Sequence, residues 1–205
     1  MTSHVRVGLF PDALHVDGGP EPDAILHRLR DADVDHLCVG DHVSFFVGAG
    51  SDGLITAASL LAAQAELPVY VGLYLLPLRH PVLVARQLAT LTELAPGRLT
   101  LGVGVGGEDR HDLEICGVDP ATRGRRMDES LRILRALADG NALSFDGEFF
   151  TLHDALIVPA PARRGELVAH RRHRRPCAAV APQAVRVRRS CRCRRVSHVV
   201  PIVVG

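Results

Sequence analysis

The chain contains no lysine, and all 24 of its basic residues are arginine. Arginine codons are rich in G and C whereas lysine codons are not, so this composition indicates a gene of high GC content. No uncharged apolar run reaches about 18 residues, which argues against a transmembrane helix. The first residues also lack a basic segment followed by an apolar one, so we expect no signal peptide and a cytoplasmic protein.

Several motifs of known chemistry are also missing. The five cysteines are an odd number without the spacing of a small disulfide scaffold, which argues against a disulfide framework. The spacing Cys191-x-Cys193 is too short for a structural zinc site without further ligands, and we expect no bound metal. There is no GxSxG nucleophile motif, and the glycines of residues 102–107 do not follow the dinucleotide fingerprint GxGxxG.

The net charge of +1 conceals two very different parts of the chain. Residues 1–162 hold 12 Arg and 22 acidic residues, net −10, whereas residues 163–205 hold 12 Arg and one acid, net +11. The second part is either a basic arm for nucleic acid or acidic partners, or an out-of-frame translation of GC-rich DNA. We favour the second interpretation, because the preceding loop should lead into a fifth strand and no strand pattern follows it.

Apolar segments alternate with amphipathic ones through the first part. The stretch 68–107 holds an apolar run, a helix pattern with Leu83, Leu88 and Leu91 as core candidates, and a second apolar run that breaks into glycines. Taken along the chain, the patterns predict strands at 5–10, 34–39, 69–76 and 98–105, helices at 21–33, 52–67, 82–94 and 123–139, and a hairpin at 143–152 around an Asp-Gly turn.

Four β-then-α units in a row predict a parallel sheet with helices outside it. A doubly wound sheet and a (β/α)8 barrel of the TIM type both fit this pattern. Such a barrel takes about 250 residues, so four units amount to its first half, strands one to four. In both folds ligands bind at the carboxyl ends of the strands.

Two histidines lie at the predicted ligand end. His42 follows the second strand directly and could exchange a proton near neutral pH. The adjacent Asp41 could hold the tautomer of His42 or contact a ligand, and the alternative is a pair of loop residues that cap nearby backbone. His80, between Arg79 and Pro81, could reach the same site, but we favour a structural role in its turn.

Glycines mark the third and fourth predicted strands. Gly72, in the middle of a strand, indicates a bulge, a close ligand approach or simple packing room. The run LTLGVGVGG at 99–107 could let backbone approach a flat or phosphorylated ligand, or could make room for barrel packing. In the predicted helix at 123–139, Arg125 and Glu129 are spaced to form an ion pair.

Four segments together resemble the luciferase-like monooxygenase family, which includes bacterial luciferase-type flavin enzymes and oxidoreductases that use the deazaflavin coenzyme F420. They cover roughly residues 3–161 and read GDHV, VGLYLLPLRHPVLVARQLATLTELAPGRLTLGVGVGGED, ICGVDPATRGRRMDESLRILRAL and FDGEFFTLHDALIVPAP. The chain departs from the family in having Tyr70-Val71 where Gly-Thr is frequent. The resemblance implies a (β/α)8 barrel with its cofactor at the carboxyl face, of which this chain carries about the first half, C-terminally truncated or frameshifted.

The resemblance also implies roles for individual residues. His42 would lie near the reactive ring of the cofactor, as the catalytic residue, with Asp41 beside it. A non-proline cis peptide at Gly72-Leu73 would form a bulge behind the ring. The remaining cofactor contacts would come from the loop after the fourth strand, at Gly104, Gly106 and Gly107.

We therefore expect an oxidoreductase that uses F420, or FMN as the second choice, to transfer hydride or activate oxygen on a small organic substrate. As a fragment it would be impaired. The alternative is a non-enzymatic binding protein with a basic tail at 163–205. A membrane partner is not expected, a nucleic-acid partner is disfavoured, and a homodimer would form if the fold is complete.

Overall fold

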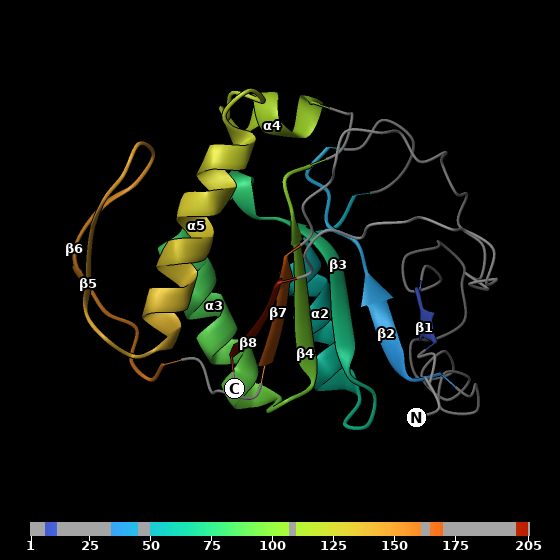
Figure 1. The fold of residues 1–205 in the computed structure, drawn as a ribbon. Coiled ribbons are helices and arrows are strands. Elements are labelled where there is room, and N and C mark those ends of the chain that lie inside the picture. Colours follow the sequence, from blue (N-terminus) through green and yellow to red (C-terminus); the bar gives the residue numbers. More distant parts are fainter. Residues whose placement is uncertain are drawn as a thin grey trace.

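The structure is a computed structural model that describes residues 7–11, 34–44, 50–106 and 110–160, together with two short strands at 165–169 and 200–204. A six-stranded sheet has the order β1-β2-β3-β4-β7-β8, and β5 and β6 form a separate two-stranded sheet (Figure 1). The predicted helix at 21–33 and the candidate site residue Gly107 lie outside the described residues.

The large sheet is parallel from β1 to β7, as the sequence predicts, and only β8 runs antiparallel to its neighbour. The small sheet is an antiparallel hairpin. The strands are β1 Gly8–Leu9, β2 His36–Val39, β3 Val69–Leu75, β4 Leu99–Gly104, β5 Leu143–Asp146, β6 Thr151–Ala155, β7 Gly165–Ala169 and β8 Val200–Val204.

The prediction that no fifth strand follows the loop at residue 162 is wrong. Strand β7 pairs in parallel with β4, with Glu166 opposite Thr100 and Val168 opposite Gly102. Strand β7 has only five residues and begins directly after two arginines, so its apolar pattern is too short to be recognised in the sequence. Its position depends instead on β4, whose unpaired edge is free to bind a further strand. Strand β8 pairs with β7 at the end of the sheet, where Pro201 is tolerated because an edge strand can lack one N–H donor.

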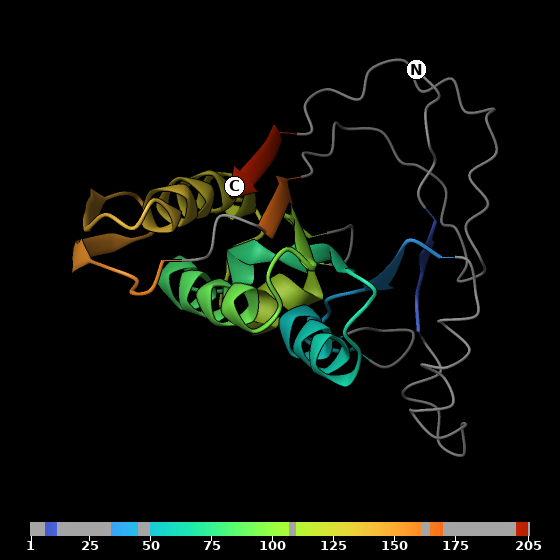
Figure 2. The same cartoon turned by 90° about the horizontal axis from the view of Figure 1, so that it is seen from below.

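Helices α2 and α3 lie along one face of the sheet, α5 packs against α3, and the β5–β6 hairpin covers the far side of α5 (Figures 1 and 2). No helix in the described ranges is long and apolar enough to cross a membrane. The short segments η2 and α4 are not predicted by periodicity. The helical elements are α2 Gly53–Ala63, η2 Leu76–Leu78, α3 Pro81–Leu94, α4 His111–Ile115 and α5 Arg123–Ala138.

The core lies between the sheet and these helices. Alternate strand residues are buried on the helix-covered face, among them Leu37, Val71 and Leu101. The prediction of Leu83 as a core residue is wrong, because its side chain is 64% exposed. Helix α3 begins at Pro81, and the face that it buries passes through Val84, Ala85, Ala89, Leu91 and Thr92.

Helix α2 ends four residues earlier than the pattern predicts. The guanidinium of Arg98 donates hydrogen bonds to the carbonyl oxygens of Leu61 and Gln64, at 2.9 and 2.7 Å. These carbonyls belong to the last turn of the helix, which has no intrahelical donors of its own for them. Arg98, just before β4, therefore caps the C-terminal carbonyl groups of α2 and connects this helix to the amino end of the sheet.

The hairpin is confirmed, but its loop is longer than an Asp-Gly turn, since Asp146 pairs with Thr151 across four intervening residues. The buried carboxylate of Glu129 accepts hydrogen bonds from two backbone amides of this loop, at 2.7 and 3.0 Å. Arg125 therefore does not pair with Glu129 as the spacing predicts. Its guanidinium makes a two-pronged ion pair with Glu148 in the hairpin loop.

We predict opposite effects for two glycine-to-alanine substitutions. A Cβ atom at Gly102, in β4, would lie 2.8 Å from the backbone oxygen of Val71 and 2.7 Å from the hydroxyl of Tyr70. Gly102→Ala should therefore cost about 1–3 kcal/mol of unfolding free energy, through overpacking. Gly124→Ala, near the start of α5 with nothing within 4 Å, should stabilise the chain by about 0.5 kcal/mol. Urea unfolding of both variants checks the pair, and equal effects would contradict the packing at Gly102.

Candidate functional site

The carboxyl ends of β2 and β3 are joined by a buried ion pair. Asp41, two residues after β2, accepts two hydrogen bonds from the guanidinium of Arg79, at 2.7 and 2.8 Å. The Asp41 side chain has no exposed surface, and that of Arg79 is 16% exposed. This two-pronged geometry is the strong form of the arginine–carboxylate interaction.

Backbone amides occupy the Asp41 oxygens as well. The N–H of Gly53, at the start of α2, donates to one oxygen at 2.9 Å, and the N–H of Leu75, at the end of β3, donates to the other at 2.7 Å. The carboxylate therefore clasps three segments of the chain together. Of the two sequence interpretations, the capping role is the one that the structure shows, and the buried carboxylate leaves no exposed atom for a cofactor.

Further contacts hold Arg79, including one to the carbonyl oxygen of Leu75 at 3.2 Å. Its guanidinium lies over the ring of Tyr74, 4.4 Å from the ring centroid, and donates to Asp52 at 3.2 Å. Burial is the largest single influence on the pKa of Arg79 and by itself would lower it, but the neighbouring Asp41, Tyr74 and Asp52 together outweigh burial, so that the pKa is raised and the arginine stays charged. Burial likewise raises the pKa of the Tyr74 phenol, which stays neutral.

His42 follows this clasp directly. Its backbone N–H donates to the carbonyl oxygen of Ser51 at 3.0 Å, and a Cβ atom at Gly50 would lie 3.0 Å from its carbonyl oxygen. The backbone at His42 is thus held closely by the loop at Gly50. The imidazole itself is 40% exposed, so it can reach a ligand at the carboxyl end of the sheet.

The carboxylate beside the imidazole is Asp112, not its sequence neighbour Asp41. Nδ1 of His42 lies 3.5 Å from Oδ2 of Asp112, while Oδ1 of Asp112 accepts the backbone N–H of Ser44 at 2.6 Å. Asp112 comes from α4, which lies at the carboxyl end of the sheet in Figure 1. Sequence reasoning missed it, because it is one of several acidic residues in an unpredicted short helix.

The predicted bulge in β3 is confirmed, and the peptide bond between Gly72 and Leu73 is cis. The pairing with β4 passes from Gly72 opposite Gly102 to Tyr74 opposite Val103, so Leu73 is the extra residue of the bulge. Its side chain consequently leaves the strand alternation and lies across β4.

The glycines of β4 make room for Leu73. A Cβ atom at Gly104 would lie 3.0 Å from a methyl carbon of Leu73, and one at Gly102 would lie 3.1 Å from the other. The packing interpretation of these two glycines therefore holds in the structure. Gly106 has a positive φ of 93°, which glycine adopts without strain, so it serves the turn after β4.

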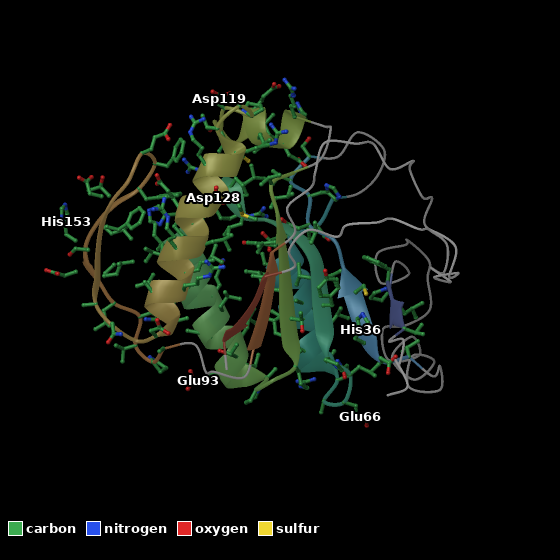
Figure 3. All side chains as sticks on the ribbon, in the orientation of Figure 1. His36, Glu66, Glu93, Asp119, Asp128 and His153 are labelled. Atoms are coloured by element: carbon green, nitrogen blue, oxygen red, sulfur yellow. The ribbon has the colours of Figure 1, made fainter. Side chains whose placement is uncertain are left out.

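The sheet face that carries Leu73 is the one opposite the helices. Further along this face the ring edge of His36, labelled in Figure 3, meets Tyr70 with centroids 6.1 Å apart. Tyr70 also fills the space beside Gly72 and Gly102, which is the place where the chain departs from the family pattern. The rings of His36 and Tyr70 thus occupy this face toward the amino end of the strands, and Leu73 lies nearer to the carboxyl end.

His80 has the structural role that we favoured. It precedes α3, and its ring meets the edge of Phe150 with centroids 5.3 Å apart. Within the described ranges, no group of three His, Cys, Asp or Glu side chains could hold a metal ion. Figure 3 places Glu66 and Glu93 at the opposite end of the sheet from Asp119, so they are remote from the end that carries His42.

Comparison with known proteins decides the family. A sequence profile of the luciferase-like monooxygenases matches residues 20–188. The chain belongs to the luciferase-like monooxygenase family. The match continues past residue 162, in agreement with the fifth strand of the sheet.

Curated relatives of this luciferase-like chain include monooxygenases and F420-dependent enzymes. The 4-hydroxyprotoasukamycin monooxygenase of Streptomyces nodosus subsp. asukaensis is 34% identical over 80% of this chain and 46% of its own. The F420-dependent glucose-6-phosphate dehydrogenase of Beutenbergia cavernae is 35% identical over 63% of this chain and 40% of its own. The chain thus spans less than half the length of these relatives.

Solved structures show the same fold. The monooxygenase RslO1 of Streptomyces bottropensis superposes with a TM-score of 0.68 at 18% identity, over 80% of this chain and 53% of that one. An F420-dependent secondary alcohol dehydrogenase superposes with a TM-score of 0.66 at 24% identity, over 80% and 51%. The fold is therefore that of the luciferase-like barrels, of which this chain covers part, and the doubly wound alternative is excluded.

We predict that the buried ion pair between Asp41 and Arg79 makes the largest contribution to the stability of the carboxyl end of the sheet. Arg79→Met should lower the unfolding free energy by about 3–5 kcal/mol, because it leaves the Asp41 carboxylate buried without its partner. Arg125→Met is the matched control, since it breaks the exposed pair with Glu148 and should barely move the urea midpoint. Equal midpoints for the two variants would contradict the account of the clasp.

Proposed function

We propose that this chain supplies the ring-facing wall of an oxidoreductase site that takes coenzyme F420, with FMN as the second choice. The observation that carries the proposal is the side chain of Leu73, seated on Gly102 and Gly104 by the bulge of β3, at the strand end where the imidazole of His42 is exposed. The cofactor ring is planar and largely apolar with one polar edge. Such a ring can rest on the apolar side chain of Leu73 while its polar edge meets the titratable imidazole of His42.

The residues fit such a ring in shape and in chemistry. Without side chains at Gly102 and Gly104, Leu73 packs close to β4 and forms a low support rather than a projection. Leu73 is only partly buried, so its outer side is available for contact. His42 is held at its backbone by Ser51, and Nδ1 of its ring lies 3.5 Å from Asp112, so that two contacts restrict the position of the imidazole.

When bound, the cofactor would supply hydride transfer or, in its reduced form with oxygen, oxygenation. The chain would supply position and a proton site. Leu73 would support the ring from behind, and the exposed edge of His42 would hold or move a proton at the reacting atoms. Asp41 and Arg79 would act only by fixing the backbone on either side of these two residues.

The relatives support both cofactors and leave the choice to experiment. F420 is placed first because an F420-dependent glucose-6-phosphate dehydrogenase and an F420-dependent alcohol dehydrogenase are among the similar proteins. FMN is retained because a similar Baeyer–Villiger monooxygenase was solved in complex with FMN. The substrate would be a small organic molecule, and the protein partner would be a second copy of the chain.

Direct titration tests the proposal. The full chain should quench the fluorescence of F420 saturably, and that of FMN more weakly, because only the ring wall contributes. Leu73→Asp should weaken this binding at least tenfold, since a charge on the apolar support opposes the ring.

Leu83→Asp is the matched control. It makes the same chemical change on the outer side of α3, where the native side chain is 64% exposed, so binding should stay as in the native chain. Absence of saturable binding for both cofactors, or equal weakening by both substitutions, would overturn the proposed function.

A further inference from the structure

Asp112 is a buried carboxylate whose two oxygens face one short loop. The residue is 5% exposed, although it lies in a helix of only five residues. One oxygen accepts the backbone N–H of Ser44 at 2.6 Å, and the other lies 3.5 Å from Nδ1 of His42. The carboxylate therefore joins α4 to the loop that follows β2, at the residue that the proposed function places beside the ring.

The two edges of the His42 ring differ in their surroundings. The Nδ1 atom is buried, whereas the side chain as a whole is 40% exposed. The exposed part of the side chain thus excludes Nδ1, and the other ring nitrogen, Nε2, lies on the edge of the ring away from that buried atom. A ligand at the carboxyl end of the sheet would meet this edge.

We propose that Asp112 is a positioning residue that holds neutral His42 as the tautomer protonated at Nδ1. An ionised carboxylate can only accept, so the atom that faces it has to be the N–H of the imidazole. The second nitrogen, Nε2, then presents a lone pair to the site. His42 accordingly begins as an acceptor of a proton or a hydrogen bond, and this use of the lone pair rests on the proposed function.

The hydrogen bond to Ser44 makes the idea sharply testable. In Asp112→Asn the backbone N–H of Ser44 still requires an oxygen, so the amide keeps its oxygen there. The NH2 group then faces Nδ1 of His42 and can only donate. The substitution preserves the shape of the side chain but should invert the tautomer, leaving the proton on Nε2.

The measurement is a long-range 1H–15N correlation spectrum of the full chain labelled with 15N-histidine, recorded at about pH 9, where an ordinary imidazole is neutral. Comparison with His42→Gln identifies the His42 signals among the 11 histidines. The native chain should show His42 protonated at Nδ1, and Asp112→Asn should show it protonated at Nε2. Asp119→Asn is the charge-matched control, since Asp119 accepts from Ala121 within its own turn, and should match the native chain.

A native His42 protonated at Nε2, or present as an even mixture of tautomers, would overturn the proposal by itself, even if Asp112→Asn failed to fold. A folded Asp112→Asn chain with an unchanged tautomer would overturn it as well. The experiment needs no cofactor. Failure of F420 and FMN to bind would therefore refute the proposed function while leaving the tautomer assignment in place. Conversely, the wrong tautomer of His42 together with saturable cofactor binding would refute the tautomer assignment alone.

Discussion

Asp41 and Arg79 are joined where water is excluded. Asp41 also accepts hydrogen bonds from the backbone N–H groups of Gly53 and Leu75, and Arg79 also donates to the carbonyl oxygen of Leu75. The pair is costly to form, since both charges leave water, and it holds only because every oxygen of the carboxylate has a donor. Its position explains the layout of the site. His42 is the next residue after Asp41, and the bulge at Leu73 lies just before Leu75, whose amide the same carboxylate binds.

The two parts of the proposed site, Leu73 and His42, therefore both depend on the Asp41–Arg79 ion pair, but different contacts fix the position of each side chain. Leu73 is placed by the bulge and by the missing side chains at Gly102 and Gly104. His42 is placed by the loop at Gly50 and by Asp112 from α4. A rigid support and an oriented proton site on elements of a parallel sheet form the kind of arrangement that can position a cofactor ring.

Local pattern predicts strands β1 to β4, helices α2, α3 and α5 and the hairpin, because periodicity and glycine or proline punctuation are local properties. The bulge at Gly72-Leu73 came from the family resemblance rather than from periodicity. Asp112 and β7 could not be predicted in the same way. The role of Asp112 depends on a contact between distant segments, and β7 exists because β4 offers an edge to a short apolar run. For Asp41 the sequence leaves the capping and the ligand-contact interpretations open for the same reason, since its partner Arg79 lies 38 residues away.

The central claim is that the ring wall is already formed by this chain, with Leu73 as its support and His42 at its edge. NMR spectra of methyl-labelled leucines and histidine ring protons, recorded with riboflavin and with its 5-deaza analogue, test this claim. These two compounds carry the cofactor ring but no phosphate group, so they report on binding of the ring alone. The account predicts that the largest ring-current shifts fall on the methyl groups of Leu73 and the ring protons of His42. Largest shifts on exposed leucines of the outer helices, such as Leu83 and Leu94, would contradict it.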